Sequence, residues 1–254
     1  MPEAQWQTGW RNYQTGLCYG GLAHAIMSGA GPIAMLSVNR YRDRHEAGQK
    51  LARALHAPSA TREMLVLALP RGGAAIGLEI ARSLHAPLDV FVVRKLGMPG
   101  HEEFALGAIA SGGVQLLDEE RIADEYIPEG AIAEIMARET AELHRREALY
   151  RHGRPPLAPA GRQVILADDG IATGYTMRTA IAALRHLRPA AITVAIPVGP
   201  PDTCEAIDHL VDVLVCPLRP DPFHAVGLWY EHFPQLSDDD VCAALAEAGQ
   251  WARA

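Results

Sequence analysis

The sequence predicts an α/β protein in which helices cover both faces of a parallel sheet. Two observations predict this class: short apolar runs alternate with longer amphipathic stretches, and several apolar runs end in proline, glycine or acidic residues. Short apolar runs are typical of strands buried on both faces, and strands that alternate with helices form parallel sheets. With 254 residues, the chain can bury one large core, or a core and a small lobe.

The first half of the chain alternates between helix-like and strand-like patterns. Residues 42–55 place Ala47, Leu51 and Leu55 on one face, which predicts an amphipathic helix. The apolar run over 64–69 precedes Pro70 and two glycines, which predicts a buried strand that ends in a turn. The elements predicted after it are a helix over 74–84, a strand over 88–93, strand-like segments over 106–110 and 114–117, and a long charged helix over 128–150.

The second half resumes the alternation after a segment rich in proline and glycine, residues 152–161. Its predicted strands cover 164–167, 191–197 and 213–216, and its predicted helices cover 176–187 and 202–210. Ligands of open parallel sheets bind beyond the carboxyl ends of the strands. We therefore expect the functional site in the loops that follow residues 69, 93, 167 and 216.

Residues 1–36 are expected to form an N-terminal extension, with the main domain over 37–254. Residues 12–39 contain no Lys, Arg, Asp or Glu, which raises the question of a signal peptide or a membrane span. Several glycines, Pro32 and the absence of a basic cluster before the run disfavour both. Met35 is an alternative translation start.

Charge and cysteine content limit the kinds of binding partner and the cellular compartment that we expect for this protein. The chain has 23 basic and 30 acidic side chains and a formal charge of -7, which disfavours a nucleic-acid partner. Its four cysteines form no CxxC pair and have no histidine at metal-ligand spacing. We expect reduced thiols, a cytoplasmic protein and no membrane partner.

The most informative loop follows the predicted strand over 164–167. It reads Asp168-Asp169-Gly170-Ile171-Ala172-Thr173-Gly174-Tyr175-Thr176. Its glycines allow the backbone to turn into a helix whose N-terminal amides bind anions, and its threonines add hydroxyl donors. The paired aspartates are acceptors suited to the hydroxyls of a sugar diol. The loop therefore has a phosphate end and a diol end.

A plainer interpretation is that the aspartates cap the following helix, because acidic residues and glycines are common in α/β turns. The chain lacks both the GxxxxGK[ST] phosphate loop and a GxGxxG turn after a strand. A nucleoside triphosphatase and a dinucleotide enzyme are therefore disfavoured.

The string VILADDGIATGYT resembles the phosphoribosyl-diphosphate signature of the type I phosphoribosyltransferases, and the resemblance extends over about 41–245. It implies a Rossmann-like parallel sheet flanked by helices, with a small hood lobe. In the family the acidic pair holds the ribose hydroxyls, and the Thr-Gly-x-Thr end holds the 5-phosphate. Hypoxanthine-guanine enzymes have an acidic general base at the position where this chain has Ala172, so that role cannot be assigned to this chain. Adenine enzymes have alanine at the same position.

The resemblance implies two further groups of site residues before the signature. They are Arg71, Gly72 and Gly73 for diphosphate binding, and Arg94, Lys95, Glu102 and Glu103 in a mobile catalytic loop over 94–103. The basic residues of that loop would cover the diphosphate, and its glycines and proline suit a lid. We hypothesise that Glu102 or Glu103 exchanges a proton with the nucleobase, because the alanine at position 172 cannot do so.

The C-terminal part of the resemblance concerns the hood, residues 216–234. Phe223, His224 and Trp229 are implied as base-binding residues, and Glu231 as a magnesium ligand through water, together with the two signature aspartates. Aromatic packing in a small lobe is an equal alternative for Phe223, Trp229, Tyr230 and Phe233.

The function implied is transfer of the 5-phosphoribosyl group from phosphoribosyl diphosphate to a nucleobase-like acceptor, as in purine salvage, with Mg²⁺ as cofactor and diphosphate released. The family's habits also imply a homodimer. One alternative is a non-catalytic sensor of phosphoribosyl diphosphate or a nucleotide, which fold alone does not distinguish. Another is hydrolysis of a nucleotide or sugar phosphate in the same pocket.

Overall fold

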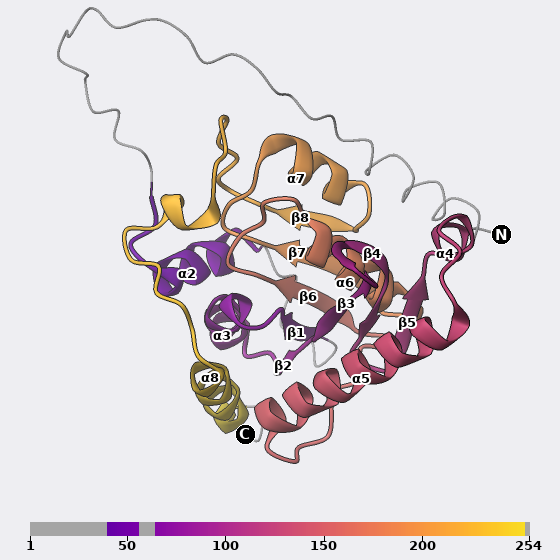
Figure 1. The fold of residues 1–254 in the computed structure, drawn as a ribbon. Helices are drawn as coiled ribbons and strands as arrows, with labels where there is room; N and C mark the ends of the chain where they lie inside the picture. The colour runs from indigo at the N-terminus through magenta and orange to yellow at the C-terminus, as the bar shows by residue number, and fades with distance from the viewer. Residues whose placement is uncertain (1–39, 56–63, 252–254) are drawn as a thin grey trace, which may run out of the picture. The chain divides into compact units, whose positions relative to one another are not determined.

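The computed structural model describes residues 40–55 and 64–251 (Figure 1). The expected N-terminal extension, residues 1–36, and the alternative start at Met35 lie outside the described residues. Within the described part, no helix is long and apolar enough to cross a lipid bilayer. The fold class that the sequence predicts is confirmed, because five parallel strands form a sheet between helices.

The central sheet has the strand order β2-β1-β6-β7-β8. Its strands are β1 Met64–Ala68, β2 Leu88–Val90, β6 Gln163–Ala167, β7 Ala191–Ala195 and β8 Val213–Val215. Ala68 pairs with Ala167, and Ala167 with Ala195, so these strands end at one level. The loops that follow β1 and β6 are therefore neighbours at the carboxyl edge of the sheet, which is the arrangement that brings two sequence motifs together.

Each face of the sheet has its own core, because successive side chains of a strand point to opposite faces. Met64, Val66 and Ala68 of β1 belong to one buried cluster, whereas Leu65 and Leu67 belong to the other. The first cluster contains helices α2 Arg44–Ala54, α3 Gly72–Leu84 and α8 Asp238–Trp251, and the second contains α6 Tyr175–His186 and α7 Pro201–Asp208. Burial on both faces explains why β1 reads as an uninterrupted apolar run.

The segment that the sequence assigns to a mobile loop, residues 94–103, forms a β-hairpin instead. Strands β3 Val93–Met98 and β4 His101–Ala110 pair antiparallel, and β5 Val114–Leu117 completes a separate three-stranded sheet. The expectation of a loop is wrong because Leu96 and Met98 are buried and alternate with more exposed residues, as in a strand with one covered face. The expected strand over 88–93 likewise ends at Val90.

Three helical elements were not predicted from the sequence. They are α4 Glu119–Asp124, the 3₁₀ helix η1 Val226–Trp229, and α8. Helix α8 has a signal that predicts it: three aspartates in its first turn favour a helix N-terminus, and Val241, Leu245 and Ala248 recur at helical spacing and are buried. The predicted helix over 128–150 is present as α5 Glu129–Arg151.

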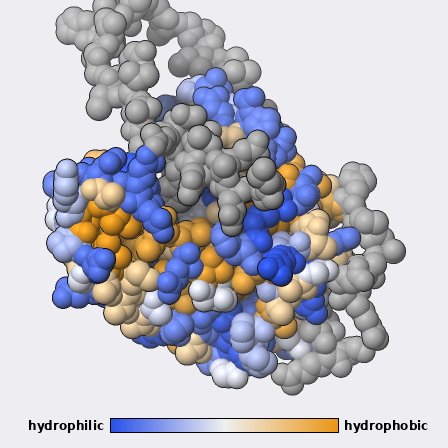
Figure 2. All heavy atoms as spheres, turned by 90° about the vertical axis from the view of Figure 1, so that its right-hand side faces the viewer, coloured by the Kyte–Doolittle hydropathy of each residue, from blue (hydrophilic) through white to orange (hydrophobic). Residues whose placement is uncertain are grey.

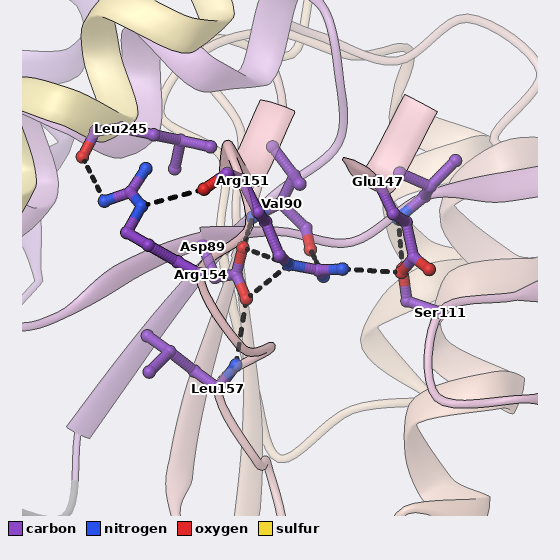
Figure 3. A network of polar contacts seen from close by, with 9 residues as sticks. Asp89, Val90, Ser111, Glu147, Arg151, Arg154, Leu157 and Leu245 are labelled. Carbon is purple, nitrogen blue, oxygen red and sulfur yellow. Dashed lines mark hydrogen bonds and ion pairs between the residues drawn. The ribbon is translucent and has the colours of Figure 1, made fainter. Parts of the chain in front are cut away.

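A buried ionic network ties α5 to the central sheet (Figure 3). Arg151 Nε lies 3.0 Å from Asp89 Oδ1 in β2, and both side chains are almost fully buried. Arg151 Nη1 also lies 2.9 Å from Glu147 Oε1, which accepts a hydrogen bond from Ser111 Oγ at 2.7 Å. The amide of Leu157 donates to Asp89 Oδ2 at 3.0 Å. The network therefore joins the sheet, the helix, the end of the hairpin sheet and the loop after α5.

The surface beside α4 and β5 has exposed apolar side chains. Phe104, Leu117 and Tyr126 are 49%, 40% and 90% exposed. Figure 2 views the side of the molecule on which Figure 1 shows α4 and β5, and hydrophobic residues gather there among hydrophilic ones. Scattered exposed apolar side chains are also common on monomeric proteins, so these residues do not identify an interface. The homodimer stays a prediction.

Candidate functional site

The two aspartates of the signature lie at the carboxyl end of β6. The backbone N–H of Asp168 donates to Ala195 O, and the N–H of Asp169 donates to Asp168 Oδ1 at 2.8 Å. Asp169 Oδ2 accepts a hydrogen bond from Arg44 Nε in α2 at 2.8 Å. Both carboxylates are half-buried at the mouth of the site. The structure therefore holds two acceptors side by side, one of them paired with a cation.

Burial controls the protonation of this pair. Desolvation raises the pKa of Asp168 well above its usual value, and the neighbouring charge of Asp169 raises it further. Desolvation also raises the pKa of Asp169, whereas the hydrogen bond and charge of Arg44 oppose that rise. Two carboxylates kept close and partly dry are unfavourable for the folded state, which is typical of a functional site.

Replacing Asp168 with asparagine is expected to stabilise the protein by roughly 0.5–2 kcal/mol at pH 7. Because the folded-state pKa of Asp168 is raised, the folded protein binds more protons than the unfolded chain above the unfolded pKa of about 3.9. Stability therefore falls as the pH rises from that value through the raised pKa. Thermal unfolding monitored by circular dichroism should show a larger gain at pH 7 than at pH 4. The exposed Asp124→Asn is the control, and an equal gain at both pH values contradicts the prediction.

The phosphate end of the loop meets the start of α6. Gly174 adopts φ +71°, a left-handed conformation that favours glycine, and it has no side chain to cap the helix. Thr173 and Thr176 are exposed on either side of it. From α7, Thr203 Oγ1 donates to Ala172 O at 3.0 Å and supports the turn. The first-turn amides of α6 and two hydroxyls are thus presented at one opening, as an anion site requires.

The predicted diphosphate loop lies directly against the acidic pair. Gly72 begins α3, and a Cβ built on it would lie 1.9 Å from Asp169 Oδ2. A Cβ built on Gly73 would lie 2.4 Å from Ala167 O at the end of β6. Arg71 is half-exposed, with Nη1 4.0 Å from Asp238 Oδ1 in α8. No side chain fits at either glycine, so the two motifs approach as closely as their backbones allow.

Replacing Gly72 with alanine is expected to weaken binding of phosphoribosyl diphosphate by about tenfold or more, because the new methyl group must displace the Asp169 carboxylate. Isothermal titration calorimetry measures the effect. Gly130→Ala is the matched control, since a Cβ there meets nothing within 4 Å. Unchanged affinity in Gly72→Ala would show that the position of Asp169 does not matter to the ligand.

The residues of the hairpin differ in their surroundings. Arg94 Nη2 and Nε lie 2.6 and 2.9 Å from Glu139 Oε2 of α5, so its guanidinium is held against the helix. Lys95 and Glu102 are exposed on β3 and β4. The side chain of Glu103 lies outside the described residues. Catalytic roles for these four residues stay predictions, and for Arg94 any such role requires release from Glu139.

The hood, residues 216–234, is attached to the segment before α2. The backbone N–H of Tyr41 donates to Trp229 O, and that of Glu231 donates to Tyr41 O. Phe223 and Trp229 are partly buried and pack against the core on this side of the sheet, as the packing alternative expects. His224 and Glu231 are exposed. Base binding by the hood and metal binding by Glu231 stay predictions.

Sequence reasoning missed two side chains that connect the hood to the signature loop. Tyr230 Oη donates to Asp169 O at 2.6 Å, and Arg44 binds the Asp169 carboxylate. A signal for Arg44 is present in the sequence, because it shares the buried helical face of Ala47 and Leu51. An arginine on the apolar face of a helix indicates a buried acidic partner.

The fold and this sheet edge define a class: a parallel α/β protein whose strand-end site combines two carboxylates, a glycine loop and a turn that leads into a helix N-terminus. The model of the phosphoribosyl transferase domain matches residues 37–229. The chain belongs to the phosphoribosyltransferase family.

Relatives and solved structures agree with this membership. Two Mycobacterium tuberculosis proteins, from strains CDC 1551 and H37Rv, carry the name "Putative phosphoribosyl transferase"; each is 39% identical over 208 residues, which are 82% of this chain and 47% of the relative. The crystal structure of TT1426 from Thermus thermophilus is 41% identical, with a TM-score of 0.71, over 82% of this chain and 98% of that one. The chain spans about half the length of the curated relatives it matches.

Proposed function

We propose that the protein transfers the 5-phosphoribosyl group from phosphoribosyl diphosphate to a nucleobase-like acceptor and releases diphosphate. The observation that carries this proposal is the close approach of Gly72 to Asp169. It brings the expected diphosphate loop, the expected diol acceptors and the start of α6 to one edge of the sheet. A ligand with two phosphate-bearing ends and a diol between them matches this arrangement.

The two ends of the ligand would bind differently. The Thr173 and Thr176 hydroxyls and the α6 amides would hold the 5-phosphate, because neutral donors and a helix N-terminus favour an anion. Asp168 and Asp169 would accept from the ribose hydroxyls. The loop at Gly72 would bind the diphosphate through backbone amides.

In the proposed reaction the bond between ribose C1 and the diphosphate oxygen breaks, and its electron pair leaves with diphosphate. An acceptor nitrogen forms the new bond to C1, and its proton passes to water or to Glu102 or Glu103. Arg71 and Lys95 would neutralise charge that develops on the leaving group. Arg94 can join them only if the hairpin moves away from Glu139.

Magnesium is the cofactor that the family implies. Asp168 and Asp169 offer the oxygen ligands that Mg²⁺ prefers, but Arg44 pairs with Asp169, and the described residues contain no cluster of three or more His, Cys, Asp or Glu able to hold a metal. An ion that arrives with the diphosphate would bind to Asp168 and Asp169 through its water ligands, and we propose Glu231 as a further acceptor for those waters. Bound there, it would stabilise charge on the leaving group.

For the acceptor we propose a purine-like base against the hood. Phe223 and Trp229 pack on the core but keep part of their surface open, and His224 is exposed beside them. Partly exposed aromatic side chains suit the stacking of a planar base.

The test uses the full chain with Mg²⁺, phosphoribosyl diphosphate and each of a panel of purine and pyrimidine bases. For at least one base, we expect diphosphate to be released and the matching nucleotide to form. Chromatography measures both products. Tight binding of phosphoribosyl diphosphate without turnover of any base would favour the sensor. Diphosphate release without a base would favour hydrolysis, and no binding at all would overturn the proposal.

A further inference from the structure

Arg44 occupies an unusual place for a cation. It is the first residue of α2, where the helix dipole disfavours positive charge, and it is only 8% exposed. A buried guanidinium needs strong partners to offset the loss of hydration. Its contacts therefore indicate what holds it there.

Three contacts surround the guanidinium of Arg44. Its Nε donates to Asp169 Oδ2 at 2.8 Å, and its Nη1 donates to Pro234 O at 2.8 Å. Its central carbon lies 3.7 Å from the centroid of the Phe233 ring. One planar group thus binds the signature carboxylate through one edge, the end of the hood through another, and an aromatic ring through its face.

The bond to Arg44 fixes the orientation of the Asp169 carboxylate. The hydrogen bond from Arg44 to Oδ2 holds the carboxylate in one orientation, and its remaining lone pairs can accept from a ligand. The carboxylate also faces Gly72, where there is no side chain to displace it. Arg44 and Gly72 together define a single position for this acceptor.

Arg44 also connects the Asp169 carboxylate to the hood. Phe233 and Pro234 end the hood segment, and Tyr230 within it donates to Asp169 O. The hood backbone also pairs with Tyr41, three residues before Arg44. Any displacement of the hood therefore changes the surroundings of Arg44 and, through it, of Asp169.

We infer that Arg44 is a positioning residue that orients Asp169 toward the ribose diol and couples this carboxylate to the hood. The inference rests on the proposed function, because it takes the diol as the ligand of Asp169. The inference goes beyond the proposed function because Arg44 lies outside the signature and is expected to affect the affinity for the sugar.

The experiment measures affinity by calorimetry for phosphoribosyl diphosphate, ribose 5-phosphate and 2-deoxyribose 5-phosphate. The variants are Arg44→Gln, Arg44→Lys and the control Arg42→Gln, whose side chain is exposed and pairs with Asp43. Arg44→Gln is expected to weaken binding of both ribose ligands about tenfold or more and to change binding of the deoxy sugar much less. Arg44→Lys should be intermediate, because it keeps the charge but not the fork of donors.

The comparison of ribose 5-phosphate with its 2-deoxy analogue separates positioning from a general effect on folding, because the two sugars differ only in one hydroxyl of the diol. If Arg44→Gln does not fold, Arg44→Lys provides the same comparison, with folding checked by circular dichroism.

The outcomes are distinct. A wild-type protein that binds no phosphoribosyl diphosphate overturns the proposed function itself. A wild type that binds it, with unchanged affinity in Arg44→Gln, overturns the role of Arg44. Equal losses for ribose 5-phosphate and its 2-deoxy analogue assign Arg44 to structure alone and also overturn the inference.

Discussion

Replacing Asp168 and Asp169 together with asparagine is expected to reduce the affinity for phosphoribosyl diphosphate by about 100-fold or more. Each carboxylate is proposed to accept from a ribose hydroxyl, and hydrogen bonds to charged groups contribute about 1.5–3 kcal/mol each. Two such losses correspond to roughly two to four powers of ten in Kd. The amides keep the size of the side chains, but Asp169→Asn also removes the charged partner of Arg44, so stability is measured on the same samples.

Calorimetry at pH 7.5 provides the measurement, with thermal unfolding recorded in parallel. The exposed Asp124→Asn should bind as the wild type does. Binding that survives in the double variant, while the protein stays folded, would remove the acidic pair from the site and with it the proposed diol contact.

Replacing Arg151 with alanine is expected to destabilise the protein by about 3–5 kcal/mol. Asp89 and Glu147 would lose their shared cation, and Asp89 is only 4% exposed, so its charge would remain buried and unpaired. Denaturant unfolding followed by circular dichroism measures the change. The matched control is Arg145→Ala on the same helix, since Arg145 is 57% exposed and its pair with Glu142 is screened by solvent, so its loss should change stability little.

A second variant separates pairing from packing. Exchanging both Asp89 and Arg151 for apolar residues of similar size removes the buried charge on β2, so it should be less destabilising than Arg151→Ala alone. A loss for Arg151→Ala no larger than that of Arg145→Ala would contradict the importance of the network.

The sequence predicts β1 and β6 of the central sheet well because these strands are buried on both faces. Met64–Ala68 and Gln163–Ala167 are short apolar runs bounded by turn residues, and nothing in their pattern competes with a strand. The hairpin was predicted less well. In β3, two basic residues precede buried Leu96, and a glycine lies between Leu96 and buried Met98. This composition is as typical of a lid as of a half-buried strand.

The loop from Asp168 to Thr176 was predicted in its place between a strand and a helix because its special residues are contiguous. The Arg44–Asp169 pair was not predicted, since 125 residues separate its members and only the folded chain brings them together. The pairing of Arg94 with Glu139 was missed for the same reason. Local patterns identify turns and faces, whereas the partner of a buried charge depends on tertiary packing.

Helix α5 contacts the hairpin through its middle and the central sheet through its C-terminal end. Glu139 grips Arg94 of β3, while Arg151, three turns further along, is anchored on Asp89. A hairpin held in this way should open together with the helix rather than strand by strand. Native-state hydrogen exchange is expected to report this as matched opening free energies for amides of β3 and of α5, which would then form one cooperative unit.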